Sequence, residues 1–96
     1  MGAETFETMA KGKTAQRAFD AAQKEARYMH GHGGYTGTIA EKPGFVVIPV
    51  PDGETPHDFV ERLLDESDPR IDDKWGPAGC VALGKDEWLF FGWASS

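Results

Sequence analysis

The stretch CVALGKDEWLFFGWA, residues 80–94, decides the fold of this chain. Two apolar runs, at residues 80–83 and 88–94, flank a short polar segment that contains glycine and aspartate. Apolar runs separated by a short turn-forming segment are typical of a β-hairpin. The second run is apolar on both of its faces over four residues. The sequence therefore predicts that two antiparallel strands form the C-terminal part of a sheet.

A strong helix-start signal precedes this hairpin. Thr55 can act as the N-cap, Pro56 suits the first helical position, and Asp58 is the acidic residue three positions after the cap. The apolar residues within 59–64 recur at helical spacing, with charged residues between them. We therefore expect a helix from Pro56 to near Glu66.

The N-terminal half predicts one more helix and three strands. A first strand is expected at residues 4–10, where threonine and phenylalanine favour β structure. A helix is expected from its N-cap at Thr14 to the glycine-rich residues 31–34, because small apolar residues recur at helical spacing. Residues 35–41 and 45–50 have β-like patterns with a Pro-Gly turn between them, so they are predicted to pair as a hairpin.

These elements together define the predicted fold. The order β-α-β-β-α-β-β predicts an α+β protein with one antiparallel sheet of about five strands and two helices on one face. The first six elements have the order of a ferredoxin-like fold, which is the leading named topology. A chain of 96 residues has room for one core, so residues 1–96 are expected to form a single domain.

Composition indicates the cellular setting. Cys80 is the only cysteine, so no disulfide can form within the chain, which fits a reducing compartment. The N-terminal residues lack the basic start and apolar run of a signal peptide, and no stretch approaches the ~20 apolar residues of a membrane helix. We therefore expect a cytoplasmic protein without a membrane partner.

Charge is distributed unevenly along the chain. Residues 1–51 contain six Lys or Arg against five Asp or Glu, whereas residues 52–96 contain four against eleven. An acidic half repels phosphate backbones and favours basic partners, although most such charge only keeps a protein soluble. A nucleic-acid partner is therefore disfavoured.

Nucleic-acid binding nevertheless remains an alternative, through one basic face of the first helix. Asp20 and Glu25 interrupt this face, and a nucleic-acid-binding domain usually has net positive charge, unlike this chain at −6. The basic residues concerned are Lys13, Arg17, Lys24 and Arg27, with Lys11 and Lys42 as possible extensions.

A second alternative is a metal site at His30 and His32. Two imidazoles one residue apart can both reach a metal ion when the backbone between them is extended. A closed site needs further ligands, and the spacing of Cys80, His57 and the loop aspartates does not predict that they converge. The competing interpretation is a helix C-terminus, where His30 favours the negative end of the helix dipole. A metal-binding protein or metal-dependent enzyme is thus kept as an alternative, and no cofactor is predicted.

The most unusual segment is the long connection at residues 67–79, which is rich in aspartate. Loops of this length in a small domain are often functional. If both helices cover one sheet face, aromatic side chains on the other face would be free to bind a partner protein or a second copy in a homodimer. The predicted partner-binding residues are Asp68, Arg70, Asp72, Asp73, Lys74, Trp75 and Trp93.

No residue set has a catalytic signature. The chain has no Gly-x-Ser-x-Gly nucleophile elbow, and Cys80 falls on a predicted strand, where a buried and inert thiol is the ordinary outcome. The leading functional hypothesis is therefore a small non-enzymatic module that binds a protein partner through the acidic loop and the C-terminal hairpin.

Two segments also carry a resemblance, GYTGTIAEK at residues 34–42 and DPRIDDKWGPAGC at residues 68–80. With them the chain resembles small proteins without a settled activity that are encoded in bacteriophage and actinobacterial genomes. The resemblance transfers no catalytic residues. It implies only a setting, in which small acidic phage proteins act as inhibitors or adaptors of host proteins.

Overall fold

The computed structural model describes residues 2–30 and 36–95, apart from the side chain of His30. The two helices and the strands at both ends of the chain form close to where the sequence predicts them, which confirms the α+β class. The elements in chain order are β1 (Ala3–Lys11), α1 (Ala15–His30), the short 3-10 helix η1 (Ile39–Glu41), β2 (Phe45–Val47), α2 (Pro56–Asp65), β3 (Ala78–Gly84) and β4 (Glu87–Ser95).

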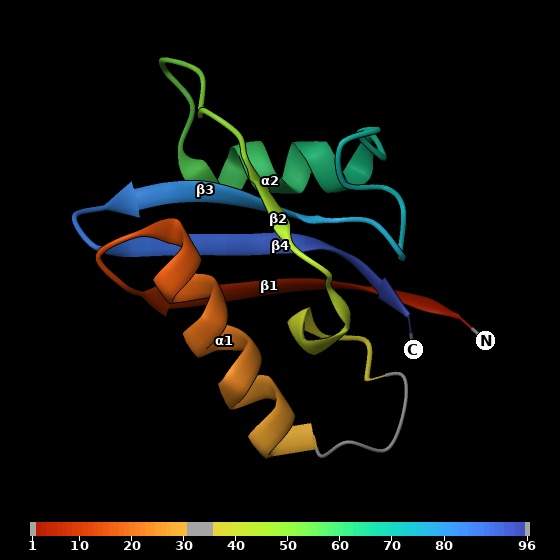
Figure 1. Cartoon of the computed structure of the whole chain (residues 1–96). Helices are drawn as coiled ribbons and strands as arrows, with labels where there is room; N and C mark the ends of the chain where they lie inside the picture. The colour runs from red at the N-terminus through yellow and green to blue at the C-terminus, as the bar shows by residue number, and fades with distance from the viewer. Residues whose placement is uncertain (1, 31–35, 96) are drawn as a thin grey trace.

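The strands of the described chain form one mixed sheet in the order β1-β4-β3-β2 (Figure 1). The predicted C-terminal hairpin is present, because β3 pairs antiparallel with β4. On its other side β4 pairs antiparallel with β1, from Ala3 opposite Ser95 to Lys11 opposite Glu87. The apolar hairpin therefore lies at the centre of the sheet, and β1 and β2 are its two edges.

The prediction that both helices lie on one face is wrong, because α1 and α2 cover opposite faces of the sheet. Phe90 of β4 packs with Phe19 of α1, with ring centroids 5.4 Å apart. Its neighbours Leu89 and Phe91 belong to the second core cluster, with Leu63 of α2. Successive side chains of a strand point to opposite faces, so a strand that is apolar on both faces needs cover on both.

The predicted strand at residues 35–41 is also wrong for its described part. Residues 36–38 form an irregular bend that leads into η1. The Glu41 carboxylate accepts hydrogen bonds from the backbone N–H and the hydroxyl of Thr36 at 3.1 and 2.9 Å, and the Thr38 hydroxyl accepts from the N–H of Ala40. These local side-chain bonds satisfy backbone groups that a strand would pair with a neighbour. Tyr35 lies outside the described residues.

The predicted strand at residues 45–50 is shortened to β2 and has a different partner. It pairs parallel with β3, with Phe45 opposite Ala78, instead of forming a hairpin with the preceding segment. Helix α2 makes the crossover that a parallel pair requires. Pro49 has no N–H for a sheet ladder, which agrees with the position of β2 at an edge. The sheet therefore has four described strands instead of five, and its order excludes the ferredoxin-like arrangement.

Candidate functional site

The loop between α2 and β3, residues 66–77, is fixed to the body of the protein near its middle. Ile71 is only 1% exposed and belongs to the core cluster under α2. Its backbone N–H donates to the carbonyl of Asp68 at 2.9 Å, and the N–H of Asp68 donates to the carbonyl of Leu63 at 3.0 Å. The first half of the loop is therefore packed and hydrogen-bonded against the same core as α2.

The second half of the loop is held by Lys42, a lysine that is only 3% exposed. Its Nζ donates hydrogen bonds to the carbonyl oxygens of Asp73 and Gly76, both at 3.1 Å. The backbone carbonyl of Lys42 accepts a 2.6 Å hydrogen bond from Gln23 of α1. Burial lowers the pKa of the Lys42 ammonium from its ordinary value, and the negative charge of Asp73 opposes this. Lys42 thus joins the loop to the α1 side of the molecule.

Trp75 lies within this fixed segment and is 54% exposed. Its backbone N–H donates to the Asp73 carboxylate at 2.8 Å, so Asp73 shapes the turn that carries the indole. The ammonium of Lys74 lies 5.6 Å from the centroid of the indole ring, a geometry that suits a cation–π interaction. The loop therefore presents a large aromatic side chain on a backbone that is hydrogen-bonded on both sides.

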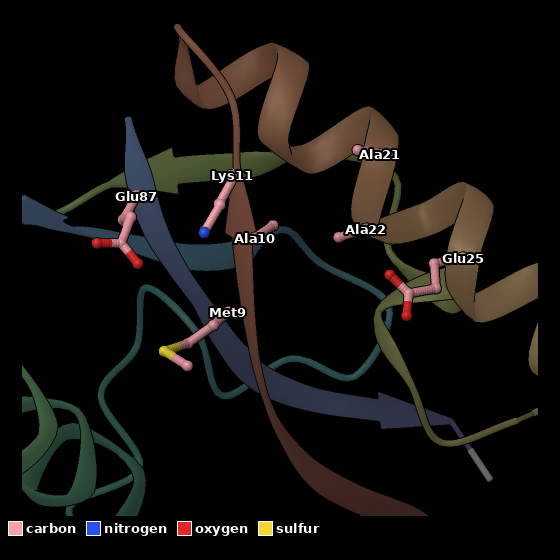
Figure 2. Close-up of a pocket in the computed structure, with 7 residues that line it drawn as sticks. All are labelled: Met9, Ala10, Lys11, Ala21, Ala22, Glu25 and Glu87. Atoms are coloured by element: carbon pink, nitrogen blue, oxygen red, sulfur yellow. The ribbon is translucent and has the colours of Figure 1, made fainter. Parts of the chain in front are cut away.

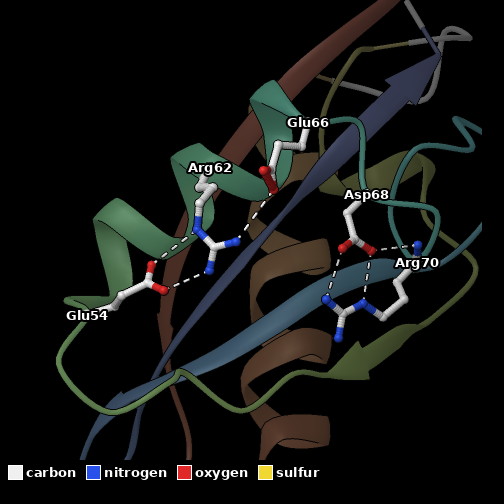
Figure 3. Close-up of polar contacts among 5 residues, drawn as sticks. All are labelled: Glu54, Arg62, Glu66, Asp68 and Arg70. Atoms are coloured by element: carbon white, nitrogen blue, oxygen red, sulfur yellow. Dashed lines mark hydrogen bonds and ion pairs between the residues drawn. The ribbon is translucent and has the colours of Figure 1, made fainter.

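Asp68 and Arg70 form an ion pair within the loop (Figure 3). The Asp68 carboxylate accepts hydrogen bonds from Nε and Nη2 of Arg70 and from the backbone N–H of Arg70, each at 2.9 Å. The side-chain bonds and then the backbone bond from Arg70 lower the pKa of Asp68 to about 2. Arg62 of α2 forms separate ion pairs with Glu54 and Glu66. Asp68 therefore has a structural role in the loop.

We expect the substitution Asp68→Asn to remove a pH-dependent part of the stability. The native pKa of Asp68 is about 2, below the value of about 3.9 for an unfolded chain, so the folded state binds fewer protons between these values. The stabilisation is therefore complete above the unfolded pKa and is lost as pH falls through the folded pKa. Because Arg70 is half exposed, we expect a difference of only about 0.5–1 kcal/mol at pH 6.

Urea unfolding of both proteins at pH 6, 3 and 2 measures this difference. It should shrink steadily toward pH 2, whereas Asp52→Asn, at an exposed turn position, should show no such trend. A difference between Asp68→Asn and the parent that stays constant with pH would contradict the assignment.

Trp93 lies on β4, outside the loop of residues 66–77. Trp93 is partly buried on the α2 face of the sheet, beside a cavity of about 430 Å³ whose lining contains no residue of 66–77. The remaining predicted loop residues stay together, and Asp72 is exposed among them. The lining of the cavity beside Trp93 consists of Thr5, Glu7, Glu61, Leu64, Asp65 and Trp93.

Sequence reasoning missed the two residues that fix the loop, Ile71 and Lys42. Ile71 had a usable signal, since it is the only aliphatic side chain within an otherwise polar, proline- and glycine-rich stretch. Lys42 had no such signal in the sequence, because the residues that accept its hydrogen bonds, Asp73 and Gly76, are 31 and 34 positions away. Its burial also removes it from the basic surface to which it was assigned.

The described residues provide no arrangement of side chains that supports the predicted metal site. His32 lies outside them, and so does the side chain of His30, whose backbone ends α1. Within residues 2–30 and 36–95, no three His, Cys, Asp or Glu side chains are grouped closely enough to hold a metal ion. Cys80 is fully buried, as predicted, and burial raises the pKa of its thiol to about 11.

The basic face of α1 is present as an exposed surface. Lys13, Arg17, Lys24 and Arg27 all lie in water, but the exposed acids Asp20 and Glu25 lie on the same helix. The mixture of signs on α1 gives no concentrated positive patch.

Among the described helices, neither α1 nor α2 is both long enough and apolar enough to cross a membrane. Comparison with protein-family models, with curated proteins and with solved structures finds no match to this chain. The case for a function therefore depends on the geometry of the described residues.

Proposed function

We propose that this chain is a small, non-enzymatic protein-binding module that contacts its partner through the loop carrying Trp75. The observation that carries the proposal is a half-exposed indole on a backbone held by Ile71 and Lys42. Exposed tryptophans are frequent energetic centres of protein interfaces. A loop that is already ordered loses little conformational entropy when it binds.

The charge around the loop favours a partner with a basic surface. Asp72 is exposed in the same loop as Trp75, and residues 52–96 carry eleven acidic against four basic side chains. Fields of this kind accelerate association with a surface of opposite sign and disfavour nucleic acid. We further propose a cytoplasmic setting and a host-protein inhibitor or adaptor role, which rest on the composition and on the phage-type resemblance of residues 34–42 and 68–80.

Affinity capture with variants tests the proposal. We expect the tagged wild-type chain to retain a specific protein from a lysate of the organism that encodes it, and Trp75→Ala to reduce that retention at least tenfold, the effect typical of a hot-spot tryptophan. The matched control is Tyr28→Ala, which removes an aromatic ring from α1 that is even more exposed, at 90% against 54% for Trp75. Quantitative mass spectrometry compares the three samples.

Equal retention by wild type and Trp75→Ala would contradict the proposed contact. Loss of the partner with both variants would also contradict it, because the effect would then be unrelated to the loop. Neither substitution removes a buried side chain, so both proteins should remain folded.

A further inference from the structure

Strand β1 has a free edge that the sheet leaves unpaired among the described residues. The N–H of Gly12 donates to the carbonyl of Asp86 at 3.0 Å, which makes these two residues a hydrogen-bonded pair of the β1–β4 ladder. Such pairs alternate along antiparallel strands, so the odd-numbered residues of β1 direct their N–H and C=O groups away from β4. Thr5, Glu7 and Met9 therefore form a line of outward backbone donors and acceptors.

A groove runs along this edge beneath α1 (Figure 2). Two cavities of about 330 and 210 Å³ lie here, and both are lined by Met9, Ala22 and Glu25. The side of the groove formed by α1 is mostly small and apolar, with Ala26 and Met29 continuing it. Met29 is 69% exposed, so apolar surface remains uncovered on the α1 wall. The exposed side chain of Met9 points away from α1 (Figure 2), toward the face of β1 that also carries Glu7.

The opposite face of the same edge is acidic. The side chain of Glu7 lines the cavity beside Trp93 together with Glu61 and Asp65 of α2. The one basic residue along this face of β1, Lys11, lies opposite Glu87 in the ladder, where the two charges offset each other. A strand added beside β1 would thus meet a mostly apolar wall with one carboxylate, Glu25, on the α1 face. On the other face it would meet the carboxylates of Glu7, Glu61 and Asp65.

We propose that this edge binds one extended peptide segment of a partner protein, which adds to the sheet as a further strand beside β1. Its alternate side chains are apolar toward α1 and basic, Lys or Arg, toward Glu7. Main-chain hydrogen bonds to an edge strand supply affinity in this mode of recognition, and side-chain pockets on alternate residues supply specificity. Charge complementarity with Glu7, Glu61 and Asp65 selects the basic partner.

The position of α1 disfavours a second copy of this chain as the occupant. Figure 1 shows α1 crossing in front of β4 and β1 and continuing beyond the β1 edge. Antiparallel pairing of two β1 strands needs a two-fold axis perpendicular to the sheet. That axis would place both α1 helices on the same face of the joined sheet, each extending over the edge where the other copy would pair. One strand without its own covering helix fits this space.

The test uses a defined probe, an acetylated and amidated octapeptide that alternates lysine and valine, with a glutamate–valine octapeptide as its counterpart. We expect the lysine peptide to slow amide exchange at Thr5, Glu7 and Met9 by at least tenfold at saturation, as measured by NMR, because these N–H groups become paired. The exchange rates of these outward amides should fall, while those of the even-numbered amides, which already donate to β4, should stay the same. The glutamate peptide should not bind.

Charge reversal at one position provides the matched pair of variants. Glu7→Lys should weaken binding of the lysine peptide about fivefold, because an exposed attraction becomes a repulsion. Glu4→Lys makes the same change of net charge on the other face of β1 and should have little effect. Both residues are exposed, so both variants should fold.

Three results with the peptides would overturn the inference: no binding of the lysine peptide at millimolar concentration, equal binding of both peptides, or protection that spares the odd-numbered amides of β1. Self-association through β1 without peptide would also overturn it, in favour of a second copy. The proposed edge site shares no residue with the loop of residues 66–77, so its failure and the failure of the Trp75 proposal are separate outcomes.

Discussion

Replacing Gly79 with alanine is expected to destabilise the folded protein by about 3 kcal/mol, the upper part of the range for overpacking a core. An added Cβ would lie 2.5 Å from Cζ and 2.8 Å from Cε2 of Phe91, and 2.9 Å from Cγ2 of Ile71. Both neighbouring side chains are almost completely buried, so neither can move into solvent. Part of the strain would fall on Ile71, the residue that fixes the loop of residues 66–77 to the core.

Urea unfolding followed by circular dichroism measures this effect. The matched control is Gly84→Ala, at the end of β3, where an added Cβ meets nothing within 4 Å. The double variant Gly79→Ala with Phe91→Leu removes the two closest atoms, so its loss should be smaller than the sum of the two single losses. A Gly79→Ala protein as stable as the parent would contradict the packing described for this face.

Replacing Lys42 with alanine should have the second largest effect, a loss of about 2–3 kcal/mol. The substitution removes two charge-assisted hydrogen bonds and leaves the carbonyls of Asp73 and Gly76 without this donor. It also removes the buried aliphatic stem. The variant Lys42→Met keeps most of the stem, so comparing the two variants separates the loss of packing from the loss of hydrogen bonds.

Amide hydrogen exchange shows whether the effect is local to the loop. In both variants of Lys42 the N–H groups of Trp75 and Gly76, which donate to Asp73, should exchange at least tenfold faster than in the parent. The control Lys85→Ala, in the exposed β3–β4 turn, should leave these rates unchanged. Unchanged exchange at Trp75 without Lys42 would show that the lysine does not hold the loop.

The elements that the sequence predicted well are those with strong local signals. Helix α2 begins where Thr55, Pro56 and Asp58 indicate, and the Thr55 hydroxyl accepts the Asp58 N–H. The C-terminal hairpin follows from two apolar runs around a turn, and Asp86 has the positive φ that such turns often need. In these segments a few neighbouring residues are sufficient to specify the backbone.

The wrong predictions concern segments whose structure depends on distant residues or on competing local bonds. Residues 36–41 have alternating β-favouring residues, but Glu41 and the threonine hydroxyls bind the backbone locally. The sides on which α1 and α2 pack could have been inferred from β4, because Leu89, Phe90 and Phe91 are apolar in succession. We instead predicted an antiparallel sheet of about five strands with both helices on one face. The ferredoxin-like topology was inferred from the order of the first six predicted elements, which included the strand at residues 35–41.

The candidate site was predictable in part. An acidic loop with an unusual tryptophan was visible in the sequence, and Trp75 is in fact half exposed. Composition alone could not show which of the loop aspartates have structural roles. Asp68 forms an ion pair with Arg70, and Asp73 accepts a hydrogen bond from the backbone N–H of Trp75. The buried role of Lys42 and the free edge of β1 depend on contacts between segments far apart in the chain.

The most direct test of the account is site-specific photo-crosslinking from the loop. A benzophenone amino acid replaces the exposed Asp72 in one protein, which leaves Trp75 in place, and Tyr28 in a control protein. Both proteins are irradiated in a lysate of the organism that encodes the chain. We expect one dominant protein adduct from position 72 that is absent from position 28. No adduct from position 72, or the same adducts from both positions, would contradict the claim that the loop of residues 66–77 is the surface through which this protein binds its partner.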